Sequence, residues 1–235
     1  MTQNVFSIQA SSFEGFSRTY FKLGTPCPQG KWQVTDRLEA LGNNQVMTNS
    51  VITVNQLWPD GSIKWLSVEG LCDAEVLSDN TPCVAVSIAK SQRPPINQAL
   101  PVKEEGEHLH IQLKNGDWVN VHGQQLMALT YSSKLYTQFY SLTANETLDT
   151  HVSNVVTDYE LLDNPLGYQA VRIQQRATLN EGTHIELDVN AQYTLFLDDG
   201  TVKGSISITN PAAASHPHGQ WDLGDPNSID IFELG

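Results

Sequence analysis

Short runs of alternating polar and apolar residues, separated by turn signals, constrain the fold of this sequence more than any other feature. Gly, Asn, Asp and Pro recur between these runs, while the 3.6-residue periodicity of an amphipathic helix is almost absent. The one segment long enough to suggest a helix, residues 124–142, is rich in Thr, Ser and Tyr and favours strands. The sequence therefore predicts an all-β protein of the kind found in sandwiches and barrels.

One hairpin, over residues 109–121, can be predicted to the level of its register. A two-residue turn at its Asn-Gly pair would mix polar and apolar side chains on each face. A three-residue loop with Gly116 in the left-handed region instead places Ile111 opposite Val119 and keeps the apolar face uniform. The opposite face then carries His108, His110, Gln112, Trp118, Asn120 and His122.

Two more hairpins are predicted from their turn chemistry. An Asp-Gly pair at residues 199–200 should form a two-residue turn that places Leu197 opposite Val202. Residues 51–58 and 62–71 flank a Pro-Asp-Gly turn and form the second candidate.

Composition changes once along the chain, at residues 91–101. This segment holds three prolines among polar residues, and proline lacks the N–H group that a central strand needs. We therefore place a boundary near residue 95, between a domain of residues 1–94 and a domain of residues 95–235.

Charge limits the classes of partner. The chain has 13 Lys and Arg residues against 26 Asp and Glu residues, a formal net charge of −13. This field repels nucleic acid and acidic membrane surfaces at long range, although a local basic pocket could still bind a charged sugar. No apolar run reaches the roughly 18–20 residues that span a bilayer, and residues 1–6 do not have the features of a secretory signal. We expect no nucleic-acid or membrane partner, and the compartment stays open.

The three cysteines, Cys27, Cys72 and Cys83, include no C-x-x-C pair, which argues against a zinc or redox motif. Buried or incidental thiols are the simplest interpretation. A Cys72–Cys83 disulfide is the alternative for an exported chain.

Three stretches carry a resemblance to a known family. Residues 21–30 contain the pattern G-x-P-x-P-x-G, residues 58–66 read W-P-D-G-S-I-K-W-L, and residues 210–228 form a run rich in His and Asp. In this order they resemble the N-terminal region of the exo-rhamnogalacturonan lyase (YetA-like) family. The resemblance implies a RIFT-barrel-like domain over residues 1–94, followed by an antiparallel, sandwich-like β domain over residues 95–235. Family members are usually several times longer, so we expect this chain to be a portion of a larger protein. No family catalytic residue matches a position of this sequence.

The best candidate site from the residues themselves is a predicted loop near the C-terminus. It gathers imidazole, indole and carboxylate groups, which can bind a ligand or transfer a proton. The residues are His216, His218, Trp221, Asp222 and Asp225.

A lyase acting on a uronic acid needs a base for the proton α to the carboxylate and a cation for the enolate. His216 or His218 could supply the base, and Arg172 or Arg176 the cation. Alternatively, the carboxylates of residues 222–228 cap two tight turns and have a structural role.

Other candidates are weaker. Trp58 and Trp65 could form a sugar platform, although the turn between them also explains this segment structurally. Acidic residues at 222–230 suggest Ca²⁺, but their spacing is not that of an EF-hand. A solvated polar face is a simpler explanation of the hairpin histidines than metal binding. We predict no cofactor and no dedicated metal site.

We therefore expect a non-catalytic β-rich portion of a polysaccharide-lyase-like protein. It would support the remainder of that larger chain or contribute to binding a uronic-acid polysaccharide or oligosaccharide. One alternative is a complete β-elimination lyase that uses His216 and His218 with Asp222 and Asp225. The other is an extracellular module for protein–protein assembly.

Overall fold

The computed structural model describes residues 3–9, 18–73, 83–94, 98–134, 137–140, 150–181 and 185–211. In this part of the chain all regular secondary structure is β-strand, and the strands assemble into antiparallel sheets. The predicted all-β class is therefore confirmed.

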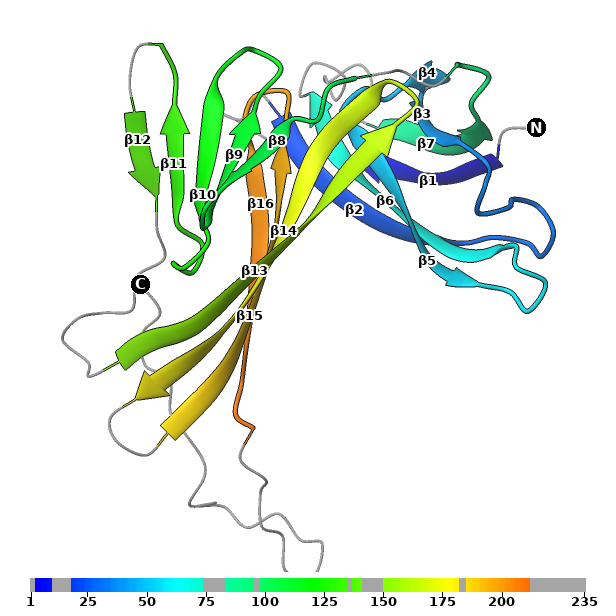
Figure 1. Ribbon diagram of the computed structural model, residues 1–235. Helices are drawn as coiled ribbons and strands as arrows, with labels where there is room; N and C mark the ends of the chain where they lie inside the picture. Colours follow the sequence, from blue (N-terminus) through cyan, green and yellow to red (C-terminus); the bar gives the residue numbers. More distant parts are fainter. Residues whose placement is uncertain are drawn as a thin grey trace, which may run out of the picture. The chain divides into compact units, whose positions relative to one another are not determined.

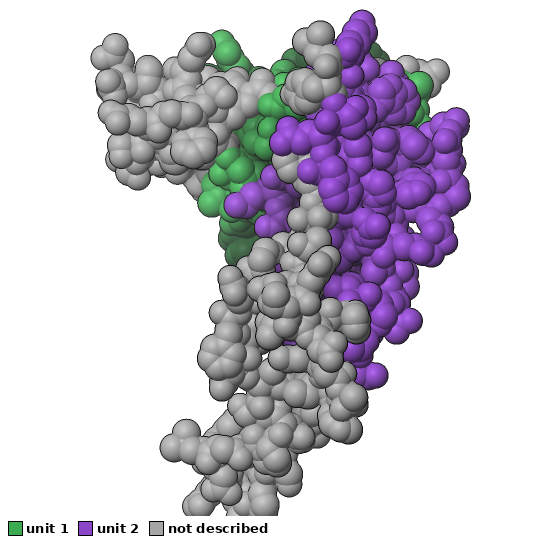
Figure 2. Space-filling view, turned by 90° about the vertical axis from the view of Figure 1, so that its left-hand side faces the viewer, with its two compact units in different colours: residues 1–100, 161–171, 196–201 green, residues 101–160, 172–195, 202–235 purple. Residues whose placement is uncertain are grey.

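The chain divides into two compact units, shown in different colours in Figure 2. Unit 1 consists of Met1–Leu100, Leu161–Val171 and Phe196–Thr201, and unit 2 of Pro101–Glu160, Arg172–Leu195 and Val202–Gly235. The predicted division into domains near residue 95 stays a prediction. Each compact unit is assembled from three segments of the chain, and compactness does not by itself make a unit an independent domain.

Unit 1 contains two antiparallel sheets (Figure 1). Sheet I has the strand order β1-β7-β3-β4, and sheet II has the order β2-β6-β5. Each sheet has two edge strands, so neither closes into a barrel in the described residues. The bounds are β1 Gln3–Gln9, β2 Arg18–Pro26, β3 Leu38–Gly42, β4 Gln45–Val46, β5 Ser50–Leu57, β6 Ile63–Asp73 and β7 Cys83–Lys90.

One apolar core cluster joins sheets I and II. Alternate residues of β6 and β7 point into it, as the period of two in a strand requires. Its buried members are Phe21, Cys27, Trp32, Leu38, Ala40, Ile63, Leu66, Val68, Cys72, Val86 and Ile88. Two of the three cysteines are thus core residues, and the Cys72–Cys83 disulfide stays a prediction.

The central strand β6 is also covered on its other face. Leu71 packs there with Val51, Leu162, Ala170 and Phe196, all within unit 1. Both faces of β6 are covered along this stretch. Its residues from Leu66 to Cys72 are therefore all buried, instead of alternating between buried and exposed positions.

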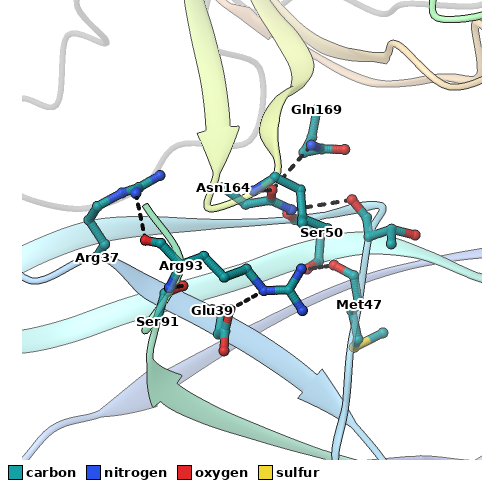
Figure 3. A network of polar contacts seen from close by, with 10 residues as sticks. Arg37, Glu39, Met47, Ser50, Ser91, Arg93, Asn164 and Gln169 are labelled. Atoms are coloured by element: carbon teal, nitrogen blue, oxygen red, sulfur yellow. Dashed lines mark hydrogen bonds and ion pairs between the residues drawn. The ribbon is translucent and has the colours of Figure 1, made fainter. Parts of the chain in front are cut away.

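A buried amide of unit 1 fixes the turn between the long strands β13 (Thr150–Asn164) and β14 (Gly167–Glu181) (Figure 3). The Asn164 side chain donates from Nδ2 to the carbonyls of Ser50 at 2.9 Å and Thr48 at 3.2 Å. Its Oδ1 accepts from the Leu166 N–H at 2.7 Å and from Gln169 Nε2 at 3.1 Å. All four hydrogen-bonding positions of the amide are therefore used.

Unit 2 contains a five-stranded sheet III, in the order β12-β11-β10-β9-β8, and most of a four-stranded sheet IV, in the order β13-β14-β15-β16 (Figure 1). Leu126 and Met127, which precede β11, pack on Ala177, Val189 and Ala191 of sheet IV. The bounds are β8 Val102–Glu105, β9 His108–Gln112, β10 Trp118–His122, β11 Leu129–Ser132, β12 Thr137–Tyr140, β13 Thr150–Asn164, β14 Gly167–Glu181, β15 Ile185–Phe196 and β16 Val202–Thr209.

The predicted register of the hairpin over residues 109–121 is confirmed. Ile111 faces Val119, His108 faces His122, and Gly116 has a φ of 88°. The apolar side chains of both strands are buried, as the choice of a three-residue loop required.

The predicted register of the hairpin around residue 200 is wrong by two residues. Val202 faces Leu195 rather than Leu197. Leu197 has left the hairpin, because its N–H donates to the Gln169 carbonyl at 2.9 Å and its side chain is buried. A shift by two preserves which face each side chain occupies, so the apolar pattern did not reveal it.

A buried hydroxyl in sheet IV gives a stability prediction. Tyr193 is 1% exposed, burial raises the pKa of its phenol, and its hydroxyl oxygen has no hydrogen-bond partner among the described residues. We expect Tyr193→Phe to raise the free energy of unfolding by about 1 kcal/mol, because an unsatisfied buried hydroxyl is removed. Urea denaturation checks this. A loss of about 1 kcal/mol or more would show that the hydroxyl has a partner in solution.

Candidate functional site

The predicted hairpin between β5 and β6 is confirmed and is held by its turn. The N–H of Trp58 donates to the Ser62 carbonyl at 2.8 Å, and the N–H of Gly61 donates to the Trp58 carbonyl at 2.9 Å. Asp60 accepts hydrogen bonds from the Ser62 hydroxyl and N–H, which lower the pKa of its carboxyl. Gly61, with a φ of 81°, occupies the left-handed region that favours glycine.

A β-bulge directly after this turn sets the direction of two side chains. Gln56 faces Trp65, whereas the next residue of β5 faces Ile63, so Lys64 is an extra residue in β6. Ile63 and Leu66 both point into the same core cluster although they are three residues apart. The bulge therefore turns both Lys64 and Trp65 away from that core.

The indole of Trp58 is fixed beside this bulge. Its Nε1 donates to the Cys27 carbonyl at 2.9 Å, and the Lys64 ammonium lies 5.0 Å from its ring centroid. A cation at this distance from an indole is attracted by the negative face of the ring. Trp58 and Lys64 are thus in contact, and Trp65 follows Lys64 in the sequence.

Trp65 is an exposed ring that lies on a glycine. Its side chain is 41% exposed, and a Cβ added to Gly24 of β2 would lie 2.9 Å from the Trp65 Nε1. Only glycine lets the indole approach β2 this closely. Lys22, two residues before Gly24, lies on the same face of the strand. We call these five residues, Lys22, Gly24, Trp58, Lys64 and Trp65, the indole–lysine surface.

A buried carboxylate supports one edge of the indole–lysine surface. Glu69 of β6 is 1% exposed and accepts a hydrogen bond from the Tyr20 hydroxyl at 2.8 Å. The Lys22 ammonium lies 3.6 Å from the same oxygen, while half of the Lys22 side chain stays exposed. The ammonium of Lys22 is thus anchored to Glu69 and remains accessible to solvent.

A second candidate surface lies on one face of sheet III and combines imidazole, carboxylate, amide, hydroxyl and phenyl groups. We call it the histidine face, and its residues are Glu105, His108, His110, Asn120, His122, Thr130 and Phe139. His110 Nδ1 lies 2.6 Å from Asn120 Oδ1, and His122 Nε2 lies 2.7 Å from Thr130 Oγ1. Burial, and then the neighbouring His108, lower the pKa of His122. Sequence reasoning found the three histidines but missed the residues from β8, β11 and β12, because only strand pairing brings them there.

An acidic groove in unit 2 was also missed from the sequence. Its volume is about 500 Å³, and its lining includes Glu104, Glu107, Asp158 and Tyr159. The Tyr159 hydroxyl donates to Glu104 at 2.8 Å, and this hydrogen bond is the main reason that its pKa is raised. Three carboxylates on one groove disfavour an anionic ligand.

The remaining predicted site residues divide into two groups. Arg172 and Arg176 lie on β14, where they pair with Glu160 and Asp158, both at 3.1 Å. Their predicted role beside an enolate stays a prediction. The C-terminal candidates His216, His218, Trp221, Asp222 and Asp225 lie outside the described residues. The acidic positions at 222–230 that suggest Ca²⁺ also lie outside them.

Searches of protein-family models, curated proteins and solved structures find no match to this chain. In the described residues, no helix has the length and apolar character needed to cross a membrane.

Proposed function

We propose that this chain is a non-catalytic, carbohydrate-binding β portion of a polysaccharide-lyase-like protein, and that it binds uronic-acid polysaccharide through the indole–lysine surface. The observation that carries the proposal is the exposed indole of Trp65, which lies on Gly24 of β2, with Lys64 next to it in the sequence and Lys22 on the same face of β2.

The chemistry of the surface suits an acidic sugar. The flat apolar side of a pyranose ring packs on an indole, which supplies contact area at a low entropic cost. The two ammonium groups can pair with a carboxylate of the sugar. Lys22 is already paired with Glu69, so Lys64 supplies the positive charge that distinguishes this surface from the acidic groove of unit 2.

Trp65→Ala tests the proposal by isothermal titration with oligogalacturonides and rhamnogalacturonan oligosaccharides. We expect at least about a tenfold loss of affinity, which corresponds to roughly 1.4 kcal/mol, because the stacking ring is removed. Trp118→Ala is the matched control, since it removes an indole of similar exposure, 38%, from sheet III. The control should bind as the wild type does.

Lys22→Gln separates charge recognition from stacking. We expect weaker binding of uronic-acid oligosaccharides and a smaller dependence on salt, with little change for neutral oligosaccharides. Equal affinity of wild type and Trp65→Ala would contradict the proposal. Release of an unsaturated product, seen by ultraviolet absorbance and lost in a His216→Ala, His218→Ala variant, would favour the complete lyase instead.

A further inference from the structure

We propose that the histidine face of sheet III binds a transition-metal cation such as Zn²⁺ or Cu²⁺, through the imidazoles of His108, His110 and His122 and the carboxylate of Glu105. This inference is independent of carbohydrate binding at the indole–lysine surface, because it concerns other residues of another sheet.

Strand register brings the four groups together. Glu105 of β8 faces His108 of β9, which in turn faces His122 of β10, so three ligand-type residues form one row across adjacent strands. His110 lies two residues from His108 and therefore on the same face of β9. The rings of His108 and His122 are already in edge-to-face contact, with centroids 5.1 Å apart.

Two of the imidazoles have the outer hydrogen bond that metal-binding histidines commonly have. A histidine ligand usually donates its second ring N–H to an oxygen, which fixes the ring orientation and tautomer. His110 Nδ1 lies 2.6 Å from Asn120 Oδ1, and His122 Nε2 lies 2.7 Å from Thr130 Oγ1. His110 Nε2 and His122 Nδ1 are then the nitrogens left for a metal.

Glu105 and His110 are close enough for one cation to contact both side chains. An amide oxygen can only accept, so His110 Nδ1 carries the hydrogen and, in the neutral imidazole, Nε2 presents a lone pair. Glu105 Oε2 lies 3.3 Å from this Nε2. Two acceptors at this distance repel each other unless a proton or a metal ion lies between them.

Metal binding requires the side chains of the histidine face to rotate. In the described part of the chain no three His, Cys, Asp or Glu side chains already converge on a common point. Glu105 also contacts the Lys103 ammonium and has to release it. His108 and Glu105 are exposed, so their rotation meets little resistance from packing. Phe139, 5.5 Å from the His122 ring, then shields one side of the site.

The ligand set selects the class of metal. Imidazole nitrogen suits Zn²⁺, Cu²⁺ and Ni²⁺, whereas Ca²⁺ and Mg²⁺ prefer oxygen ligands. A row of three imidazoles and one carboxylate should therefore bind Zn²⁺ or Cu²⁺ and not Ca²⁺.

Titration of the full chain with ZnCl₂, followed by calorimetry and by the imidazole NMR signals, tests the proposal. We expect one Zn²⁺ per chain, shifts of the His108, His110 and His122 signals, and weaker binding as the pH falls below about 6.5, where imidazoles bind protons. Affinity should fall at least about tenfold in His108→Gln and in His122→Gln, which corresponds to roughly 1.4 kcal/mol.

A His216→Ala, His218→Ala variant is the matched control, because it removes two other histidines that are spaced as in His-x-His. It should keep the affinity of the wild type. Loss of Zn²⁺ binding in this variant, or unchanged binding in His108→Gln and His122→Gln, would overturn the proposal. Circular dichroism of each variant without metal separates loss of ligands from loss of fold.

Discussion

Gly70→Ala is expected to destabilise the protein by about 3 kcal/mol, since overlap with backbone cannot be relieved by a rotamer change. A Cβ at this position would lie 2.4 Å from the Asn49 carbonyl oxygen and 2.9 Å from the Ser50 Cα. The same carbonyl accepts the Leu71 N–H at 2.9 Å, so moving it away also weakens the pairing of β5 with the central strand β6. The midpoint of urea denaturation measures the effect.

Gly204→Ala is the matched control, because its closest contact is of a different kind. The added Cβ would lie 3.0 Å from the Met127 Cε, the end of a flexible side chain, and 3.1 Å from the Tyr193 Cβ. Small movements relieve both contacts, and we expect a change within about 1 kcal/mol. Equal midpoints for Gly70→Ala and the wild type would show that β5 and β6 are farther apart in solution than in this structure.

Where local chemistry decided the structure, the sequence predicted it. The hairpin at Gly116 was correct because its loop length follows from the turn residue and the apolar alternation of its own two strands. The Pro-Asp-Gly turn before β6 was correct for the same reason. The hairpin at Gly200 failed because Leu197 bonds to Gln169, twenty-eight residues earlier, and no local pattern encodes that contact.

The indole–lysine surface shows the same contrast between features set by local sequence and features set by distant contacts. Trp58 and Trp65 could be selected from the sequence, because two indoles flank a recognisable turn. Gly24 and Lys22 could not, because only the pairing of β2 with β6 places Gly24 against the Trp65 ring and Lys22 on the same face of the sheet. The bulge at Lys64 was also hidden, since it becomes visible only when the partners of Gln56 and Ile63 are known.

Asn164→Asp is expected to lower the free energy of unfolding by about 3–5 kcal/mol at pH 7, because a carboxylate accepts hydrogen bonds but donates none. The amide it replaces is 8% exposed and donates to the carbonyls of Ser50 and Thr48. In the variant, a buried negative charge would face these two oxygens. Urea denaturation at pH 7 measures the loss, and the same experiment at lower pH identifies its cause.

The pH dependence separates a buried charge from general disruption of the turn. Burial and the two carbonyls should raise the folded-state pKa of the new carboxyl above its unfolded value of about 3.9. The folded variant then binds more protons than the unfolded one, so the loss relative to wild type should shrink as the pH falls towards 4.5 and reach its full size above the folded pKa. Asn180→Asp is the control, because its Nδ2 donates to one hydroxyl, Ser153 Oγ at 3.0 Å, which can rotate to donate to the new carboxylate. A loss at Asn164 that does not change with pH would contradict the buried-charge account and leave distortion of the β13–β14 turn as the cause.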